Sequence, residues 1–311
     1  MVATSRPDAE QHAFLADLVS AGLLIPSGVP GVHGTSAVFE DVRLAFERLF
    51  AQVAAEDRPE QLRFPPVFPR RDLESIGYLE SFPHLLGSVF AFEGDEQSAV
   101  EQEARAARHD DWSEFQRATD LVLLPAACYP VYPAVAARGT LAPGGVTVDA
   151  GGAYVFRQEP SYDPTRLRTF RQREMVRIGE PEAVLSWRDL WRERALRLLR
   201  GLGLEAADDV AADPFFGRKG RMLARSQREQ ALKLEVTVPI AGPEPTAVAS
   251  FNYHQDHFAA VFGLATSEGA VAHTACLGFG EERIVLALFR AHGLDPDAWP
   301  APVRTRLWGT T

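Results

Sequence analysis

The chain has 311 residues, of which 46% are hydrophobic and 24% charged, a balance typical of a soluble globular protein with one or two domains. Its net charge of −10 weighs against a surface that wraps a polyanion such as tRNA. Residues 1–8 lack the basic and apolar regions of a secretory signal. No stretch approaches the roughly 18 apolar residues of a membrane span, so we expect a cytoplasmic protein without membrane contact.

The N-terminal third is predicted to be mainly helical. A first helix is expected from Asp8 to Ala21, and the glycine- and proline-rich run 28–34 predicts a loop. Thr35 or Ser36 can cap a second helix. Its apolar residues recur at helical spacing: Val38, Val42, Ala45, Phe46, Leu49 and Val53. A strand-like stretch, 62–68, and a polar helical segment, 95–115, come next.

From Gly144 onward, short β-branched or aromatic runs separated by turns predict an antiparallel sheet. The expected strands are 146–148, 153–156, 169–176, 232–238 and 247–253. Ser186 and Asp189 form a capping box, which predicts the start of a helix there. The apolar side of this helix would carry Trp187, Leu190, Trp191, Ala195 and Leu198. A last helix is expected from Glu281 to His292, and strands with helices set to one side indicate an α+β fold.

Two segments carry residues suited to nucleotide chemistry. The first is Phe156-Arg157-Gln158-Glu159, followed by a turn-rich loop and then by Arg166-x-x-x-Phe170-x-x-x-Glu174. An arginine at the end of a strand can hold a phosphate and a carboxylate together, although a surface ion pair also explains the short Arg157–Glu159 pattern. The second segment, 276–283, is a glycine-containing strand that leads into the helix predicted from Glu281. The segment ends at Arg283, whose side chain can stack on a base or bind a phosphate.

In this order the two segments resemble motifs 2 and 3 of the class II aminoacyl-tRNA synthetases, and 42–53 followed by Pro65 and Pro66 is similar to motif 1. The resemblance implies an antiparallel sheet flanked by helices over residues 35–311, after an N-terminal extension, 1–34. It also implies a homodimer that binds ATP with Mg2+, in which Arg157, Glu159 and Arg283 are catalytic. The ATP-binding residues that it implies are Arg157, Glu159, Arg166, Leu167, Ala247, Val248, Ala249, Ser250 and Arg283.

Magnesium ligands are less well defined by the sequence. The strand 246–250 lacks the acidic residue that many class II cores place there, and Glu235 is left as the candidate.

The two cysteines, Cys128 and Cys276, are too few for a disulfide framework and could be buried small hydrophobic residues. Together with Glu174 they resemble the zinc ligands of the archaeal seryl-tRNA synthetases. The resemblance implies zinc with three protein ligands and one open position for a substrate amine. Glu174, Arg157 and Asn252 would bind the amino acid, and His254 and His273 are rival ligands for the metal.

Seryl-tRNA synthetases carry a further N-terminal tRNA-binding region, for which no basic, heptad-rich stretch of this chain is suited. The chain is therefore identified as a member of the amino acid:(carrier protein) ligases, truncated relatives of the zinc-dependent synthetase core. This resemblance implies activation of glycine or alanine as the adenylate and its transfer to the phosphopantetheine arm of an acidic carrier protein, without tRNA. A basic helical insertion at about 205–231 would bind the carrier and its arm through Arg218, Lys219, Arg221 and Arg225.

Two other functions are compatible with these residues. The chain could be a tRNA-dependent synthetase or an editing paralogue of one. It could also be a non-catalytic module that senses an amino acid or a nucleotide. Intact Arg157, Glu159, Glu174 and Arg283 favour a working enzyme over a retired one.

Overall fold

The computed structural model describes residues 9–159 and 161–309, and its centre is a large, mostly antiparallel sheet. Within these residues the strand order is β10-β11-β12-β13-β9-β7-β3, with β8 paired to β9. Among the described strands of this sheet, the pairing of β3 with β7 is parallel and the others are antiparallel. The strands are β3 (Glu60–Gln61), β7 (Val146–Asp149), β8 (Ala153–Phe156), β9 (Thr169–Gly179), β10 (Ala207–Val210), β11 (Lys233–Val238), β12 (Thr246–Gln255) and β13 (His273–Gly280).

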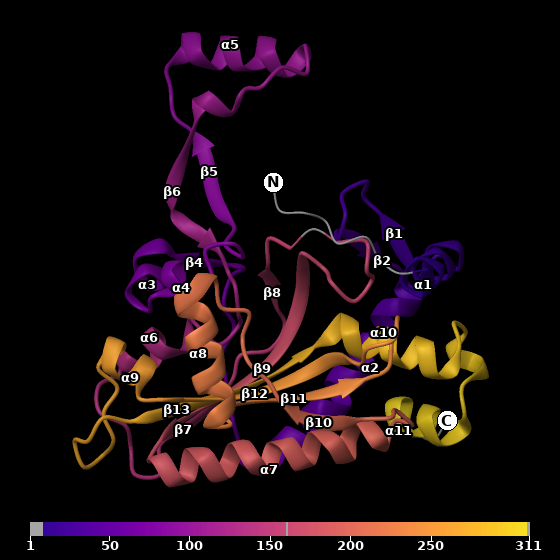
Figure 1. Cartoon of the computed structure of the whole chain (residues 1–311), viewed down its shortest axis with the longest axis vertical. Helices are drawn as coiled ribbons and strands as arrows, with labels where there is room; N and C mark the ends of the chain where they lie inside the picture. The colour runs from indigo at the N-terminus through magenta and orange to yellow at the C-terminus, as the bar shows by residue number, and fades with distance from the viewer. Residues whose placement is uncertain (1–8, 160, 310–311) are drawn as a thin grey trace.

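Long helices cover one face of this sheet and enclose the larger hydrophobic core. They are α2 (Ala37–Ala54), α7 (Pro181–Arg200) and α10 (Glu281–His292), and α7 crosses beneath the strands in Figure 1. The hydroxyl of Ser36 caps α2 by accepting from the backbone N–H of Phe39. Further along α2, Phe50 stacks on Trp191 of α7 and meets Phe279 of β13 edge-on. These contacts fix the helices against the strands that carry the site.

The opposite face of the sheet is covered by a second, smaller core. Successive side chains of β13 point alternately into one core and into the other. Leu277 and Phe279 belong to the larger core, whereas Cys276 belongs to the smaller one. Short helices and the loop before α6 complete this second core. The helices are α3 (Arg70–Ser75), α4 (Tyr78–Ser81), α6 (Val131–Ala136) and α9 (His257–Phe262).

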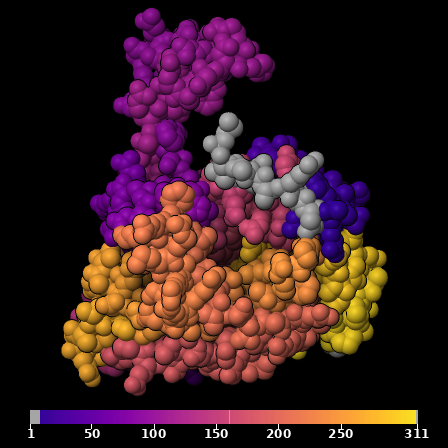
Figure 2. All heavy atoms as spheres, in the orientation of Figure 1, coloured from indigo at the N-terminus to yellow at the C-terminus, as the bar shows by residue number. Residues whose placement is uncertain are grey.

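A narrow arm projects from the body on the side of the second core. It is built from β4 (Val67–Pro69), β5 (Ser88–Phe92) and β6 (Gln116–Leu123), with α5 (Glu96–Ala107) near its end. Figures 1 and 2 show that the outer part of the arm stands clear of the rest of the chain. Phe90, on β5, is accordingly 57% exposed.

The chain's first and last helices pack onto the body. Phe14 and Leu18 of α1 (Ala9–Ser20) are buried in the larger core. A small hairpin follows, formed by β1 (Leu24–Pro26) and β2 (His33–Thr35). Residues 1–8 of the predicted N-terminal extension, including the predicted first helical residue Asp8, lie outside the described residues. The remaining elements are η1 (Ala55–Asp57), η2 (Ser113–Phe115), α8 (Gly217–Glu229), η3 (Pro296–Ala298) and α11 (Ala301–Trp308).

Buried ion pairs join α2, β9 and α10. Arg171 of β9 donates to Glu40 at 2.6 Å and to Glu282 at 2.7 Å, and Arg43 of α2 donates to Glu281 at 2.7 Å. Burial, followed by the nearby Glu47, raises the pKa of Glu281 to about 7. The segments that resemble motifs 1, 2 and 3 are thus tied to one another by charge as well as by apolar packing.

Most elements predicted from periodicity are confirmed, and the misassignments have clear causes. The strand 153–156 and the helix Glu281–His292 are found where they were expected. The capping box at Ser186 is wrong, because α7 already begins at Pro181, whose fixed φ suits the first helical turn. Leu190, expected on the apolar side of α7, is 41% exposed. Of the strand predicted over 62–68, only residues 67 and 68 lie in a strand of the structure, β4, because Pro65 and Pro66 have no N–H to donate to a ladder.

None of the helices in the described residues is both long and apolar enough to span a bilayer.

Candidate active site

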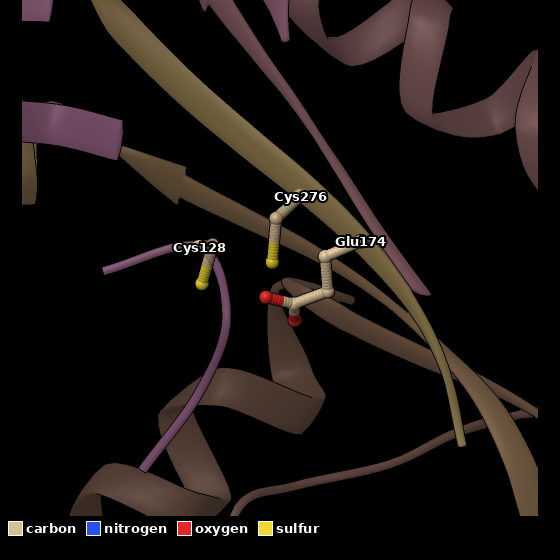
Figure 3. A group of neighbouring side chains, drawn as sticks. All are labelled: Cys128, Glu174 and Cys276. Carbon is tan, nitrogen blue, oxygen red and sulfur yellow. The ribbon is translucent and has the colours of Figure 1, made fainter. Parts of the chain in front are cut away.

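Cys128, Glu174 and Cys276 meet in the interior from three different segments. Cys128 lies in the loop before α6, Glu174 in β9 and Cys276 in the neighbouring strand β13. Their side chains point toward one another in Figure 3, and their ligand atoms all lie within 4.8 Å of one another. The β9–β13 register places Gly278 opposite Glu174, so Cys276 follows two positions away on the same face of the sheet.

These three side chains have the chemistry of a catalytic zinc site. Thiolates and carboxylates are common zinc ligands, and three protein ligands leave one position for a substrate. All three residues are buried, and Oε2 of Glu174 has no hydrogen-bond partner among the described residues. A buried polar atom without a partner costs about 1–3 kcal/mol. The residues therefore fit a zinc ion, which would supply the missing partner.

The electrostatics of the cluster favour a cation. Burial, followed by the neighbouring Cys276 and Glu174, raises the pKa of the Cys128 thiol. Burial also raises the pKa of Glu174 well above its usual range, with Cys276 acting in the same direction. The pKa of the Cys276 thiol shifts the other way, because the hydrogen bond with Cys128 lowers it more than burial raises it. A divalent cation bound between the three residues would offset two of the three negative charges that the ionised side chains carry.

Gly278 makes room for the carboxylate of Glu174. A Cβ at position 278 would lie 2.8 Å from Oε1 and 3.0 Å from Cγ of Glu174. Both distances are too short for ordinary packing, and β13 is fixed between β9 and β12. The glycine spacing of this strand, visible in the sequence, therefore has a structural role next to the candidate ligands.

Gly278→Ala should weaken zinc binding by about tenfold or more, because the new methyl group pushes the Glu174 carboxylate away from the two thiols. Zinc affinity measured in competition with a chelator tests this expectation. Gly280→Ala is the matched control, since the nearest atom beyond the two neighbouring residues, Cδ of Arg283, would lie 3.7 Å from the new Cβ. Equal zinc affinity in the two variants would contradict the role given to Gly278.

Cys276 has two nitrogen neighbours on β12. The side-chain amide of Asn252 donates to its Sγ at 3.5 Å, and Nε2 of His254 lies 3.7 Å from the same sulfur. The amide oxygen of Asn252 is buried and has no hydrogen-bond partner among the described residues. His273, the other histidine suggested by the sequence, instead contacts the hydroxyl of Tyr253. Of the two, His254 is therefore the histidine next to the cluster.

A cavity of about 350 Å³ opens from these residues toward the surface. Cys128, Glu174 and Cys276 line its inner part, and Arg157 also borders it. Leu223 and Gln227, on α8, line the same cavity. One continuous space thus connects the candidate metal ligands with the basic helix.

Three arginines lie near one another, and one of them, Arg157, lines this cavity. Arg157, which follows β8, forms no ion pair among the described residues, and its guanidinium lies over the ring of Phe170 at 5.9 Å. Arg283 donates to the backbone oxygens of Thr165 at 2.7 Å and Ala247 at 2.8 Å. Burial, followed by the nearby Arg157 and Arg166, lowers the pKa of Arg283 to about 10. Crowded positive charges of this kind suit a polyanion.

The other residues assigned to ATP from the sequence occupy varied positions. Glu159 accepts from Arg166 at 2.8 Å, and neither lines the main cavity. Leu167 borders a separate small cavity of about 90 Å³. The side chains of Val248 and Ala249 are buried in the larger core, so only their backbone could face a nucleotide. Ser250 lines the main cavity.

The basic helix α8 is anchored by a residue that the sequence did not single out. Asp213 accepts from Lys233 of β11 at 2.7 Å and from Gln227 of α8 at 2.8 Å. Lys233 also pairs with Glu235, the magnesium candidate, at 3.0 Å. Lys233 is one of two lysines in the whole chain, and this rarity was the available signal.

The four cations predicted to bind a carrier all lie on α8 and are exposed. Lys219 pairs with Glu80 of α4 at 2.8 Å, and Arg225 pairs with Glu229 one turn along the helix at 2.7 Å. Arg218 and Arg221 form no ion pair within the described part of the chain. The predicted insertion also contains β10, which is the edge strand of the main sheet next to β11.

The antiparallel sheet and its flanking helices define a class II aminoacyl-tRNA synthetase-like fold. The crystal structure of M. kandleri SerRS in complex with A. aeolicus tRNASec superposes with a TM-score of 0.81, covering 98% of this chain and 62% of that one at 22% identity.

More specifically, the chain belongs to the family of the amino acid–(acyl-carrier-protein) ligases. Two such ligases from Bradyrhizobium diazoefficiens are each 45% identical to it. The alignment with ligase 1 spans 98% of this chain and 94% of the relative, and that with ligase 2 spans 97% and 89%. No family model matches the chain.

Proposed function

We propose that this protein activates a small amino acid, glycine or alanine, with ATP and transfers it to the phosphopantetheine thiol of a carrier protein. The observation that carries the proposal is the single cavity that joins Cys128, Glu174 and Cys276 to Arg157 and to the basic helix α8. The names of the two ligases that are 45% identical support both the reaction and the carrier.

The amino acid would bind at the inner end of the cavity. Zinc held by Cys128, Glu174 and Cys276 would act as a Lewis acid that fixes the substrate's free amine. The unpartnered amide oxygen of Asn252 is available to accept from the same amine. Tyr129 and Phe258 border the same cavity as Cys128, and these bulky rings would leave room for hydrogen or methyl as the substrate's side chain.

Adenylation would depend on charge and position rather than on a covalent nucleophile. A carboxylate oxygen of the amino acid attacks the α-phosphorus of ATP, the bond to the bridging oxygen breaks, and pyrophosphate leaves. Arg157 would hold the carboxylate and the α-phosphate, with Arg283 and Arg166 near the remaining phosphates and Glu159 near the adenine. Magnesium would neutralise the phosphate oxygens, with Glu235 as its candidate ligand.

The second step would use the outer part of the cavity. The phosphopantetheine sulfur attacks the carbonyl carbon of the adenylate, AMP leaves with the bonding electron pair, and the thiol proton passes to solvent. The carrier itself would dock on α8, where Arg218 and Arg221 stand without ion-pair partners within the described residues. A basic helix on a chain of net charge −10 is a local attraction for an acidic carrier.

Pyrophosphate exchange with a panel of amino acids tests the first step, and labelled amino acid offered to a phosphopantetheinylated carrier and to total tRNA tests the acceptor. We expect exchange with glycine or alanine and label on the carrier. Label on tRNA alone would favour a tRNA-dependent synthetase or editing paralogue. Absence of any exchange would favour a sensing module. A homodimer and a cytoplasmic location stay predictions from the sequence.

Replacing Arg218, Arg221 and Arg225 with Glu should slow transfer to the carrier by about tenfold or more at low salt while leaving pyrophosphate exchange nearly unchanged. Transfer alone should be affected, because only the second step uses the α8 surface. The control reverses three exposed arginines elsewhere, Arg108, Arg117 and Arg197. Undiminished transfer in the α8 variant would exclude this helix as the docking surface.

A further inference from the structure

His254 is contacted on both of its ring nitrogens within the smaller core. Its Nε2 lies 3.7 Å from Sγ of Cys276. Its Nδ1 lies 3.2 Å from the hydroxyl of Thr274 and 3.5 Å from the hydroxyl of Tyr132. The imidazole therefore bridges a candidate metal ligand and two hydroxyl groups.

The backbone is shaped to place this ring. The pairing of β12 with β13 shifts between Tyr253 and Gln255, on either side of His254. Gln255 has a φ of 54°, in the left-handed region that a residue with a side chain rarely adopts. Irregularities of this kind re-aim a side chain and often occur at functional sites.

Aromatic packing holds the imidazole in this orientation. Phe258 of α9 meets the ring of His254 edge-on, with ring centroids 4.8 Å apart. Tyr132 stacks on the face of the same phenyl ring, with centroids 4.1 Å apart, and its own ring meets that of His254 edge-on. The ring is therefore restrained by packing as well as by its polar contacts.

The contacts define which nitrogen would carry the proton in the metal-bound protein. A cysteine that binds zinc is a thiolate and has no proton to donate. The contact with Cys276 then requires a proton on Nε2, and in the neutral imidazole this makes Nδ1 an acceptor. The hydroxyls of Thr274 and Tyr132 can both donate, so the surroundings supply the partners that this tautomer needs.

We propose that His254 is a positioning residue, which donates its Nε2–H to the Cys276 thiolate, orients that sulfur toward Cys128 and Glu174, and thereby strengthens zinc binding. The inference rests on the proposed function, which supplies the zinc. His254 acts through Cys276 and not as a ligand, because the group of ligand atoms within 4.8 Å of one another consists of Cys128, Glu174 and Cys276 without it.

The test measures metal binding rather than activity. In His254→Ala we expect zinc affinity, measured by chelator competition, to fall about 10- to 100-fold. In the cobalt-substituted protein, the thiolate-to-cobalt charge-transfer band should move to longer wavelength, because the thiolate loses a hydrogen-bond donor. His254→Gln, whose amide N–H can still reach the sulfur, should restore part of both properties.

His273→Ala is the control, since His273 is a partly buried histidine of β13 that contacts Tyr253 instead of the cluster. It should leave affinity and spectrum unchanged. Wild-type zinc affinity and an unshifted band in His254→Ala would overturn the inference while the proposed function stands. A wild-type spectrum that shows an imidazole ligand, lost in both His254 variants, would overturn it too. Failure of the wild-type protein to bind zinc would instead refute the zinc site of the proposed function.

Discussion

Arg157→Ala should lower amino acid-dependent pyrophosphate exchange by at least about a hundredfold. Arg157 borders the cavity without an ion-pair partner among the described residues, so its charge is available to the carboxylate and the α-phosphate as negative charge develops. Loss of one such preorganised donor typically costs a factor of about 100 to 1,000 in rate. Steady-state exchange kinetics with the preferred amino acid provide the measurement.

Arg177→Ala is the matched control for this variant. Arg177 lies on β9, the strand that pairs with β8, and its guanidinium bonds to Thr147 at the far end of β9 from Arg157. It should exchange pyrophosphate at close to the wild-type rate. If Arg157→Ala did so too, with its circular dichroism unchanged, the assignment of this arginine to the transition state would be wrong.

Cys128→Ala should abolish adenylation and reduce zinc from about one ion per chain to a small fraction of that. With one thiolate gone, only Glu174 and Cys276 would remain in the cluster, too few for a three-ligand site. ATP binding should persist, because the arginines lie on other segments. Elemental analysis gives the zinc content, and equilibrium binding gives the affinity for ATP.

Metal removal from the wild-type protein provides the control for Cys128→Ala. Chelation should abolish exchange, and added zinc should restore it in the wild type but not in the variant. Undiminished zinc in Cys128→Ala would contradict the site. Adenylation that survives complete removal of zinc would contradict the role of the metal in holding the amine.

Local sequence patterns predicted the parts of the fold that depend on neighbouring residues. The helix from Glu281 to His292 has an apolar face at helical spacing and a glycine after its last residue, so its bounds were correct. The capping box at Ser186 failed because a pattern of four residues can fall inside a longer helix, here α7. The arm strands β5 and β6 were not anticipated, since each gains its stability from pairing with a partner distant in sequence.

The candidate site likewise contains residues that the sequence could identify and residues that only the fold reveals. Cys128, Glu174 and Cys276 were grouped by resemblance to a known family, and they are brought together by the fold. His254 and Asp213 were not assigned these roles, because their contacts cannot be read from the sequence. His254 contacts the sulfur of Cys276, and Asp213 bonds to Lys233 and Gln227. Only the register of β12 against β13 and the placement of α8 reveal them.

The three candidate ligands belong to a loop and two strands that meet only when the sheet has formed. An ion held by all three would therefore bind the native chain and hardly the unfolded one. By mass action, a free concentration 1,000-fold above the dissociation constant would add about 4 kcal/mol to the free energy of unfolding. That increment is comparable to a large share of the net stability of an ordinary domain. The cellular zinc supply would thus affect the fraction of the protein that is folded, in addition to its binding of the substrate amine.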